Sequence, residues 1–345
     1  MASPVPNQRP VRRLPLPHFF QKRFRHVILH ITERCTLRCR SCFVKKSARD
    51  LSLKEAEILA QKLGAPRWLD IGGGEPFLHP QLPEICALFP RSDLTIPTNG
   101  QAPEHIEQTV RQIAGAHRKP LTIALSLDGF EEANDLIRGK GSFARAMESY
   151  RRLRAIEGIS LKINTVVCNA NAGELLSFMA YVRSLDPDYH SLLLLRGVPE
   201  DNDLSLPPLS FLEEHTPEIL GILGSYLYSK KDNALLRRLK KHYQRYLWQV
   251  SLKSLKEQRW LVPCQAPRLH RVIYADGSLS MCELMPSAGN LLREPMDSLE
   301  QKMKHALAAH EKAHGGCFCT HNCNMAENIM THPYSILAVL LGLKP

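Results

Sequence analysis

The sequence predicts an α/β fold in which parallel strands alternate with helices between residues 26 and 197. The first observation is a series of short apolar runs, expected as strands near 26–32, 68–72, 93–97, 121–127, 160–167 and 190–196. The second observation is a set of intervening segments with helical periodicity, near 52–63, 103–114, 142–157 and 172–185. Strands separated by helices of this length form parallel βαβ units, so a parallel sheet is expected.

Polar motifs follow the predicted strands. Gly73-Gly74-Glu75-Pro76 closes the second strand, Thr98-Asn99-Gly100 the third and Ser126-Leu127-Asp128-Gly129 the fourth, while Asn164 lies within the fifth. The first helix also has a start signal, because Ser52 and Glu55 form a capping box. Since functional groups gather at the carboxyl ends of parallel strands, these polar side chains are expected to share one edge of the sheet.

The remaining segments differ in character. Residues 198–260 are expected to form a helical insert, within which a basic amphipathic helix spans roughly 230–247. Residues 261–330 read as a small cysteine-rich module that contains a hairpin turning at Asp276-Gly277. A basic extension, 1–25, and an apolar tail, 331–345, complete the chain.

Three cysteines, Cys35, Cys39 and Cys42, follow the first predicted strand within eight residues. Thiolates at such spacing can hold three corners of an iron–sulfur cube and leave the fourth iron open to another molecule. A zinc loop is the alternative, but zinc modules usually show two C-x2-C pairs or cysteines followed by histidines at finger spacing. The spacing therefore favours a [4Fe-4S] cluster.

This cysteine loop, together with the motifs that follow the strands, resembles the radical S-adenosylmethionine (SAM) enzymes. The chain departs from the family where an aromatic residue often precedes the third cysteine, because Ser41 stands there. The resemblance implies a partial (β/α)6 barrel over 26–197, a [4Fe-4S] cluster on the three cysteines, and SAM bound at the open iron. It also implies reductive cleavage of SAM to a 5'-deoxyadenosyl radical, which takes a hydrogen atom from the substrate.

The resemblance also suggests residues that bind SAM. Glu75, on a turn made flexible by Gly73 and Gly74, is expected to accept a hydrogen bond from the SAM ammonium. Arg138 has a guanidinium suited to the SAM carboxylate, although a surface turn is an equally good explanation. The remaining candidates are expected to contact the ribose or carboxylate and are Ser126, Asp128 and Asn164.

The second cysteine set resembles the auxiliary-cluster modules of the SPASM/Twitch branch of that family. Its members are Cys264, Cys282, Cys317, Cys319 and Cys323. Five cysteines favour one auxiliary [4Fe-4S] cluster used for electron transfer, with one of the last three cysteines left over. A structural zinc is the alternative, because thiolates suit both metals.

Composition restricts the cellular location and the partners that we expect for the protein. The net charge is +11, and residues 1–25 carry no acidic residue. No signal peptide is visible, and the apolar tail is shorter than the roughly 20 residues that a spanning helix needs, so a cytoplasmic location is expected. No nucleic-acid-binding module is recognised, which argues against a nucleic-acid partner. The basic helix and apolar tail leave peripheral membrane contact open.

Modification of a peptide or protein is the first functional prediction, by a radical SAM maturase whose reductant would be a flavodoxin or ferredoxin. Only a short segment precedes the first strand, so recognition of a leader peptide would need a separate binding protein. One alternative is a radical dehydrogenase or modifying enzyme for a small-molecule or lipid-linked phosphorylated substrate. Another is an iron–sulfur binding or sensing protein without catalytic activity.

Overall fold

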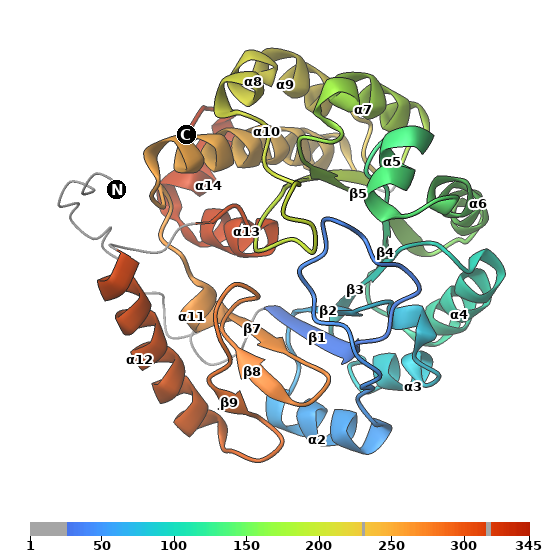
Figure 1. The fold of residues 1–345 in the computed structure, drawn as a ribbon, viewed down its shortest axis with the longest axis vertical. Helices are drawn as coiled ribbons and strands as arrows, with labels where there is room; N and C mark the ends of the chain where they lie inside the picture. Colours follow the sequence, from blue (N-terminus) through green and yellow to red (C-terminus); the bar gives the residue numbers. More distant parts are fainter. Residues whose placement is uncertain (1–25, 230–231, 315–318) are drawn as a thin grey trace.

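The computed structural model describes residues 26–229, 232–314 and 319–345. Its centre is a single curved sheet whose described strands are ordered β6-β5-β4-β3-β2-β1-β7-β8-β9 (Figure 1). The first six strands in the chain are β1 (His26–Thr32), β2 (Trp68–Gly73), β3 (Asp93–Thr98), β4 (Leu121–Ser126), β5 (Ile159–Val167) and β6 (Tyr189–Leu194). Each pairs in parallel with the next, which confirms the predicted βαβ alternation.

Helices cover the outer face of this sheet (Figure 1). The predicted helices are confirmed as α2 (Leu53–Leu63), α4 (Pro103–Ala116), α6 (Ser142–Arg154) and α7 (Leu175–Ser184). The structure adds short elements that the sequence did not predict: η1 (Pro76–Leu78), α3 (Leu82–Ala87) and α5 (Glu131–Arg138), while η2 (Ala172–Glu174) forms the start of the helical segment predicted at 172–185. These elements have at most eight residues, too short for a clear helical period.

The main hydrophobic core lies between the sheet and its helices. In β1 the alternating residues Val27, Leu29 and Ile31 join this core and are fully buried. The intervening positions of the same strand include His26 and His30, which are also buried but polar. Because side chains alternate across a strand, the other face of β1 is a polar interior.

The C-terminal half completes the same sheet. The predicted hairpin is confirmed as β7 (His270–Ile273) and β8 (Ser278–Ser280), followed by β9 (Gly289–Asn290). β7 pairs in parallel with β1, so this hairpin extends the central sheet and is not a detached unit. Two further elements flank the hairpin: α11 (Ala266–Leu269) and α12 (Met296–His314).

The segment predicted as a helical insert consists of α8 (Leu209–Glu214), α9 (Thr216–Ser225) and α10 (Ala234–Glu257). After α12, the chain returns as α13 (Asn322–Thr331) and α14 (Pro333–Leu341), which pack beside α10 (Figure 1). The predicted apolar tail is therefore mostly a helix. None of the described helices is long and apolar enough to cross a membrane. The predicted extension 1–25 lies outside the described residues.

Candidate active site

The first cysteine set lies on the loop that leaves the carboxyl end of β1. Cys35, Cys39 and Cys42 are partly exposed, and none forms a disulfide. Burial raises the pKa of Cys35 and of Cys39, and the nearby Cys42 thiolate raises both further. The sulfurs therefore lie close enough to influence one another, and positive charge from a bound metal cluster would relieve that repulsion.

The glycine-rich turn after β2 holds the start of this loop. The backbone N–H groups of Gly74 and Glu75 donate to the carbonyls of Thr32 and Arg34, each at 2.8 Å. Gly73 has a φ of +123°, and a Cβ atom there or at Gly74 would lie 2.1 Å from a carbonyl oxygen at the end of β1 or the start of the loop. The close backbone approach that the glycines allow is thus to the cysteine loop itself. Contact of Gly73 and Gly74 with SAM stays a prediction.

Glu75 is buried, and its carboxylate links this turn to the end of β3. Its Oε1 accepts from the Thr98 hydroxyl at 2.9 Å, and its Oε2 accepts from the Asn99 backbone N–H at 2.7 Å. Burial raises the pKa of Glu75 to about 7 in spite of these donors. The Asn99 amide in turn donates toward the Cys35 sulfur at 3.7 Å. Glu75 therefore helps to position Cys35, and its predicted bond to the SAM ammonium stays a prediction.

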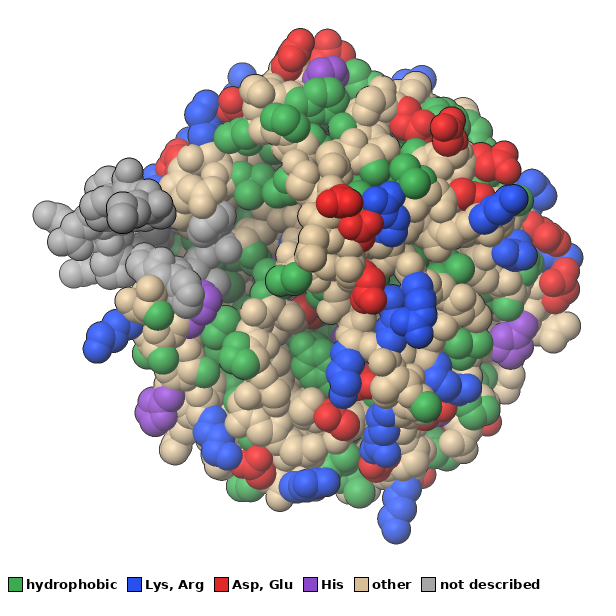
Figure 2. Space-filling model, viewed as in Figure 1, with side chains coloured by type: hydrophobic (Ala, Val, Ile, Leu, Met, Phe, Trp, Pro, Cys, Tyr) green, Lys and Arg blue, Asp and Glu red, His purple; other side chains and the backbone are tan. Residues whose placement is uncertain are grey.

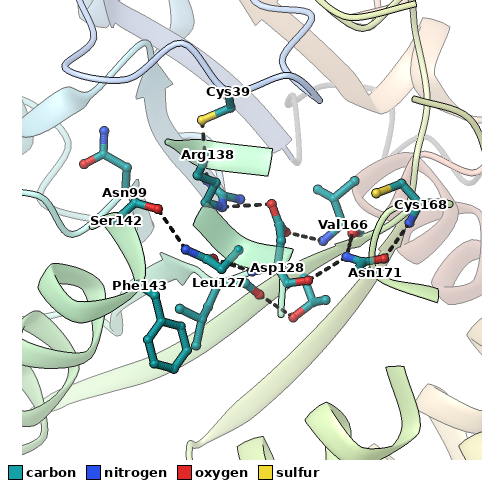
Figure 3. Close-up of polar contacts among 12 residues, drawn as sticks. Cys39, Asn99, Leu127, Asp128, Arg138, Ser142, Phe143, Val166, Cys168 and Asn171 are labelled. Atoms are coloured by element: carbon teal, nitrogen blue, oxygen red, sulfur yellow. Dashed lines mark hydrogen bonds and ion pairs between the residues drawn. The ribbon is translucent and has the colours of Figure 1, made fainter. Parts of the chain in front are cut away.

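An ion pair supports the middle of the loop (Figure 3). Arg138, at the end of α5, places its Nε 2.8 Å from Asp128 Oδ2 and directs another nitrogen toward the Cys39 sulfur at 3.9 Å. Asp128 is fully buried, and its other oxygen accepts from the Val166 N–H at 2.7 Å. Burial would lower the pKa of Arg138, but Asp128 and Cys39 raise it, so the guanidinium is a permanent cation beside the loop. The roles predicted for Arg138 and Asp128 in binding SAM stay predictions.

Ser126 and Asn164 lie directly opposite each other on β4 and β5 and are both half-buried. The Asn164 Oδ1 atom is buried and has no hydrogen-bond partner among the described residues. A buried acceptor without a partner is costly unless another molecule satisfies it. This pair therefore fits a polar ligand at the mouth of the sheet, as the sequence predicts for SAM.

A hollow lies beside the third cysteine of the loop. It has a volume of about 370 Å³ and is lined by Arg38, Cys42, Phe43, Val44, Lys45, Lys46, Val198, Pro199 and Glu200. Figure 2 shows Lys and Arg side chains gathered over this part of the molecule. The rim of the first cysteine set is therefore basic, and one of its thiols borders an open surface.

The second cysteine set is assembled from distant elements. Cys282 is buried in the main core, and Cys264 packs against that core and against a second cluster that Cys319 also contacts. Cys323, on α13, has its sulfur 3.8 Å from Asp70 Oδ2. Burial, together with the Asp70 carboxylate, raises the pKa of Cys323 to about 11. Cys317 lies outside the described residues.

The polar interior holds a cluster that the sequence reading missed. His26 lies 3.0 Å from Asp70 and 3.5 Å from Glu327, and the His270 ring lies 3.8 Å from the same Glu327. All four side chains are largely buried. The sequence offered no signal for this group, because its members come from β1, β2, β7 and α13 and show no regular spacing.

Known proteins are similar in sequence to part of this chain. Residues 29–181 match the family model "Radical SAM superfamily". Among curated relatives, the mycofactocin maturase MftC of Mycobacterium ulcerans is 28% identical over 44% of this chain and 42% of its own length. AlbA, a subtilosin biosynthesis protein of Bacillus subtilis, is 28% identical over 46% of this chain and 37% of its own length. The matched part thus spans less than half of each relative.

Solved structures share the fold. The structure of polyhistidine-tagged anSMEcpe with bound AdoMet superposes with a TM-score of 0.60 and 15% identity over 81% of this chain and 79% of that chain. Streptococcus suis SuiB bound to S-adenosylmethionine gives a TM-score of 0.59 and 16% identity over 79% of this chain and 64% of that chain. The family implies a [4Fe-4S] cluster and SAM, and the three free thiols and the unpartnered Asn164 oxygen fit these groups. Residues 29–181 of this protein therefore resemble the radical SAM superfamily in sequence, and most of the chain shares the fold of these solved structures.

Proposed function

We propose that this protein is a radical SAM enzyme that modifies a peptide, with Cys35, Cys39 and Cys42 holding the cluster that binds SAM. The single observation that carries the proposal is the cysteine loop, whose three free thiols are supported at the mouth of a parallel sheet. When bound, the cluster and SAM would supply a 5'-deoxyadenosyl radical that abstracts a substrate hydrogen.

The surrounding residues have distinct tasks in this proposal. The Gly73-Gly74-Glu75 turn holds the start of the loop through its backbone, and Glu75 orients Asn99 toward Cys35. Arg138 places a fixed positive charge beside Cys39, which favours the thiolate form that a metal cluster needs. Ser126 and Asn164 offer polar atoms to SAM from neighbouring strands.

The relatives support a peptide as the substrate class. MftC is described as a mycofactocin maturase, AlbA acts in the biosynthesis of the bacteriocin subtilosin, and SuiB has been solved with its precursor peptide SuiA. For this chain we infer a peptide as the class of substrate and no particular peptide, because fold and family do not determine a substrate.

The second cysteine set supports an auxiliary [4Fe-4S] cluster for electron transfer. Cys264, Cys282 and Cys319 would be ligands, together with Cys317. Cys323 would be the cysteine left over, because its thiol lies against the Asp70 carboxylate, which disfavours a thiolate.

The basic rim supports an acidic electron donor, such as a flavodoxin or ferredoxin. Arg38 and Lys45 line the hollow that Cys42 borders, and the Lys45 side chain is 76% exposed, with its ammonium 3.7 Å from Glu33. Complementary charge would bring an acidic donor protein to the thiol that borders this hollow.

The proposal is tested by anaerobic reconstitution with iron and sulfide, followed by SAM and dithionite and an assay of 5'-deoxyadenosine. The wild-type protein should form this product, and the Cys35→Ala/Cys39→Ala/Cys42→Ala variant should lose it by at least about a thousandfold. Cys86→Ala is the matched control, since this cysteine is buried in the core far along the chain from the loop. Absence of product from iron-loaded wild-type protein, with a candidate peptide present, would contradict the proposal.

A further inference from the structure

The C-terminal helix α14 has its polar and apolar faces reversed relative to a helix that packs on a core. Its inward face carries Ser335, which is fully buried and accepts a hydrogen bond from the Tyr246 hydroxyl of α10 at 2.9 Å. The small residue Ala338 also packs inward, with Val339. A surface helix of a water-exposed protein normally turns its largest apolar side chains toward the core.

The outward face of α14 and the residue just beyond it are rich in large apolar side chains. The exposed ones, with their exposed fractions, are Tyr334 (75%), Ile336 (40%), Leu337 (52%), Leu340 (52%), Leu341 (59%) and Leu343 (56%). Positions three and four apart lie on the same side of a helix, so Leu337, Leu340 and Leu341 form one continuous surface. Large apolar side chains that gather on one exposed face indicate an interaction site.

α10, which packs beside α14, carries exposed basic side chains on the same side of the molecule as His242. His242 of α10 marks the seam between the two helices, because its ring nitrogen lies 3.0 Å from the Val339 carbonyl. Arg238 and Arg245 lie four residues before and three residues after His242, so they occupy the same flank of that seam, and both are exposed. Lys344 adds an exposed cation at the end of the apolar surface.

Acidic side chains are nearly absent from this part of the chain. Residues 332–345 contain none, and α10 contains only Glu257, in its last turn. Lys240 pairs with Asp232, but neither Arg238 nor Arg245 pairs with a carboxylate among the described residues. The surface therefore combines apolar side chains with uncompensated positive charge.

We propose that this face of α14 and α10 docks onto an anionic lipid membrane. Apolar side chains beside basic ones are the combination that inserts at the boundary of acyl chains and negatively charged head groups. A protein partner with an apolar groove would explain the leucines, but the absence of acidic residues favours a surface that is uniformly negative. The helix lies in the interface in this arrangement and does not cross the membrane.

The test is co-sedimentation of the full reconstituted chain with vesicles of phosphatidylcholine, with and without phosphatidylglycerol. Binding is expected only with phosphatidylglycerol and should weaken as salt rises, because the basic contribution is screened. Leu337→Glu/Leu341→Glu should reduce the vesicle affinity by at least about tenfold. Arg238→Glu/Arg245→Glu should do the same, because each basic residue near an anionic surface strengthens binding about fivefold.

Leu136→Glu is the matched control, because this leucine is 54% exposed on α5, outside the proposed surface. It should bind vesicles like wild type. All variants replace exposed residues, and circular dichroism with the iron content checks that they fold. The proposal is overturned if wild type does not bind anionic vesicles, or if Leu337→Glu/Leu341→Glu binds them as well as the control. Light scattering that shows a dimer dissociated by this double variant would instead assign the face to a second copy of the chain. None of these readouts depends on cleavage of SAM.

Discussion

The two cysteine sets of this protein are built in opposite ways. Cys35, Cys39 and Cys42 lie within eight residues on one loop, partly exposed beneath a basic rim. Cys264, Cys282 and Cys319 come from segments far apart in the chain and pack against apolar clusters. The first set lies on one short loop, whereas the second is spread over the C-terminal part of the chain.

Different parts of the molecule support the two cysteine sets. The first loop is held by the turn after β2, by Arg138 of α5, and by backbone N–H groups of residues 200 and 201 that donate to carbonyls of the loop. The second set depends on β7, which joins the sheet beside β1, and on α13, which packs beside α10. Local changes should therefore affect the first set residue by residue, whereas the second should respond to changes in packing.

The largest expected effect is a loss of bound iron, which should distinguish Cys282 from Cys323 within the second set. Cys282→Ala should lose about four irons per chain, the content of one cubane cluster, and should still cleave SAM. Cys323→Ala should keep its iron, because the Cys323 thiol faces Asp70 and His26. Iron analysis and electron paramagnetic resonance of the reduced proteins measure both outcomes.

Cys168→Ala is the control for that comparison, since this buried thiol belongs to neither set. Equal iron loss from Cys323→Ala and Cys282→Ala would show that Cys323 is a ligand. The assignment of the leftover cysteine would then be wrong.

A smaller effect is expected from the ion pair that supports the first loop. Arg138→Met leaves Asp128 buried without its partner, which should lower the free energy of unfolding by about 3–5 kcal/mol. Burial already raises the pKa of Asp128, and loss of the cation raises it further. A carboxyl group whose pKa is higher in the folded than in the unfolded protein stabilises the fold at low pH and loses that contribution as pH rises. The loss of unfolding free energy caused by Arg138→Met should therefore be larger at about pH 8 than at about pH 6.

Denaturant unfolding at the two pH values measures this deficit. Asp128→Asn/Arg138→Met should recover part of the stability, because no uncompensated charge remains. A double variant that is as unstable as Arg138→Met at both pH values would show that the buried charge is not the cause.

The smallest expected effect concerns the basic rim that distinguishes the first set from the second. Lys45→Glu should lower the rate of 5'-deoxyadenosine formation driven by reduced flavodoxin by about tenfold at low ionic strength. The rate driven by dithionite should not change, because a small reductant needs no docking surface. Lys304→Glu, an exposed lysine of α12, is the control of equal charge. An equal loss in both assays would place the defect in the cluster itself.

The sequence by itself determined the strands of the parallel sheet, the cysteine loop and the motifs that follow the strands. These features depend on local sequence: apolar runs, a capping box at Ser52, and cysteines and glycines at short spacing. The short helix α5, which carries Arg138, was not predicted because eight residues are too few for a clear period.

Only the tertiary structure decided which distant side chains meet. The sequence shows no relation between Cys323 and Asp70, or between His26 and Glu327, because hundreds of residues separate them. It also shows an apolar α14 without revealing that Ser335 faces inward and the leucines face outward. Such contacts depend on how whole elements pack, and packing is a property of the closed sheet and its helices, not of any local segment.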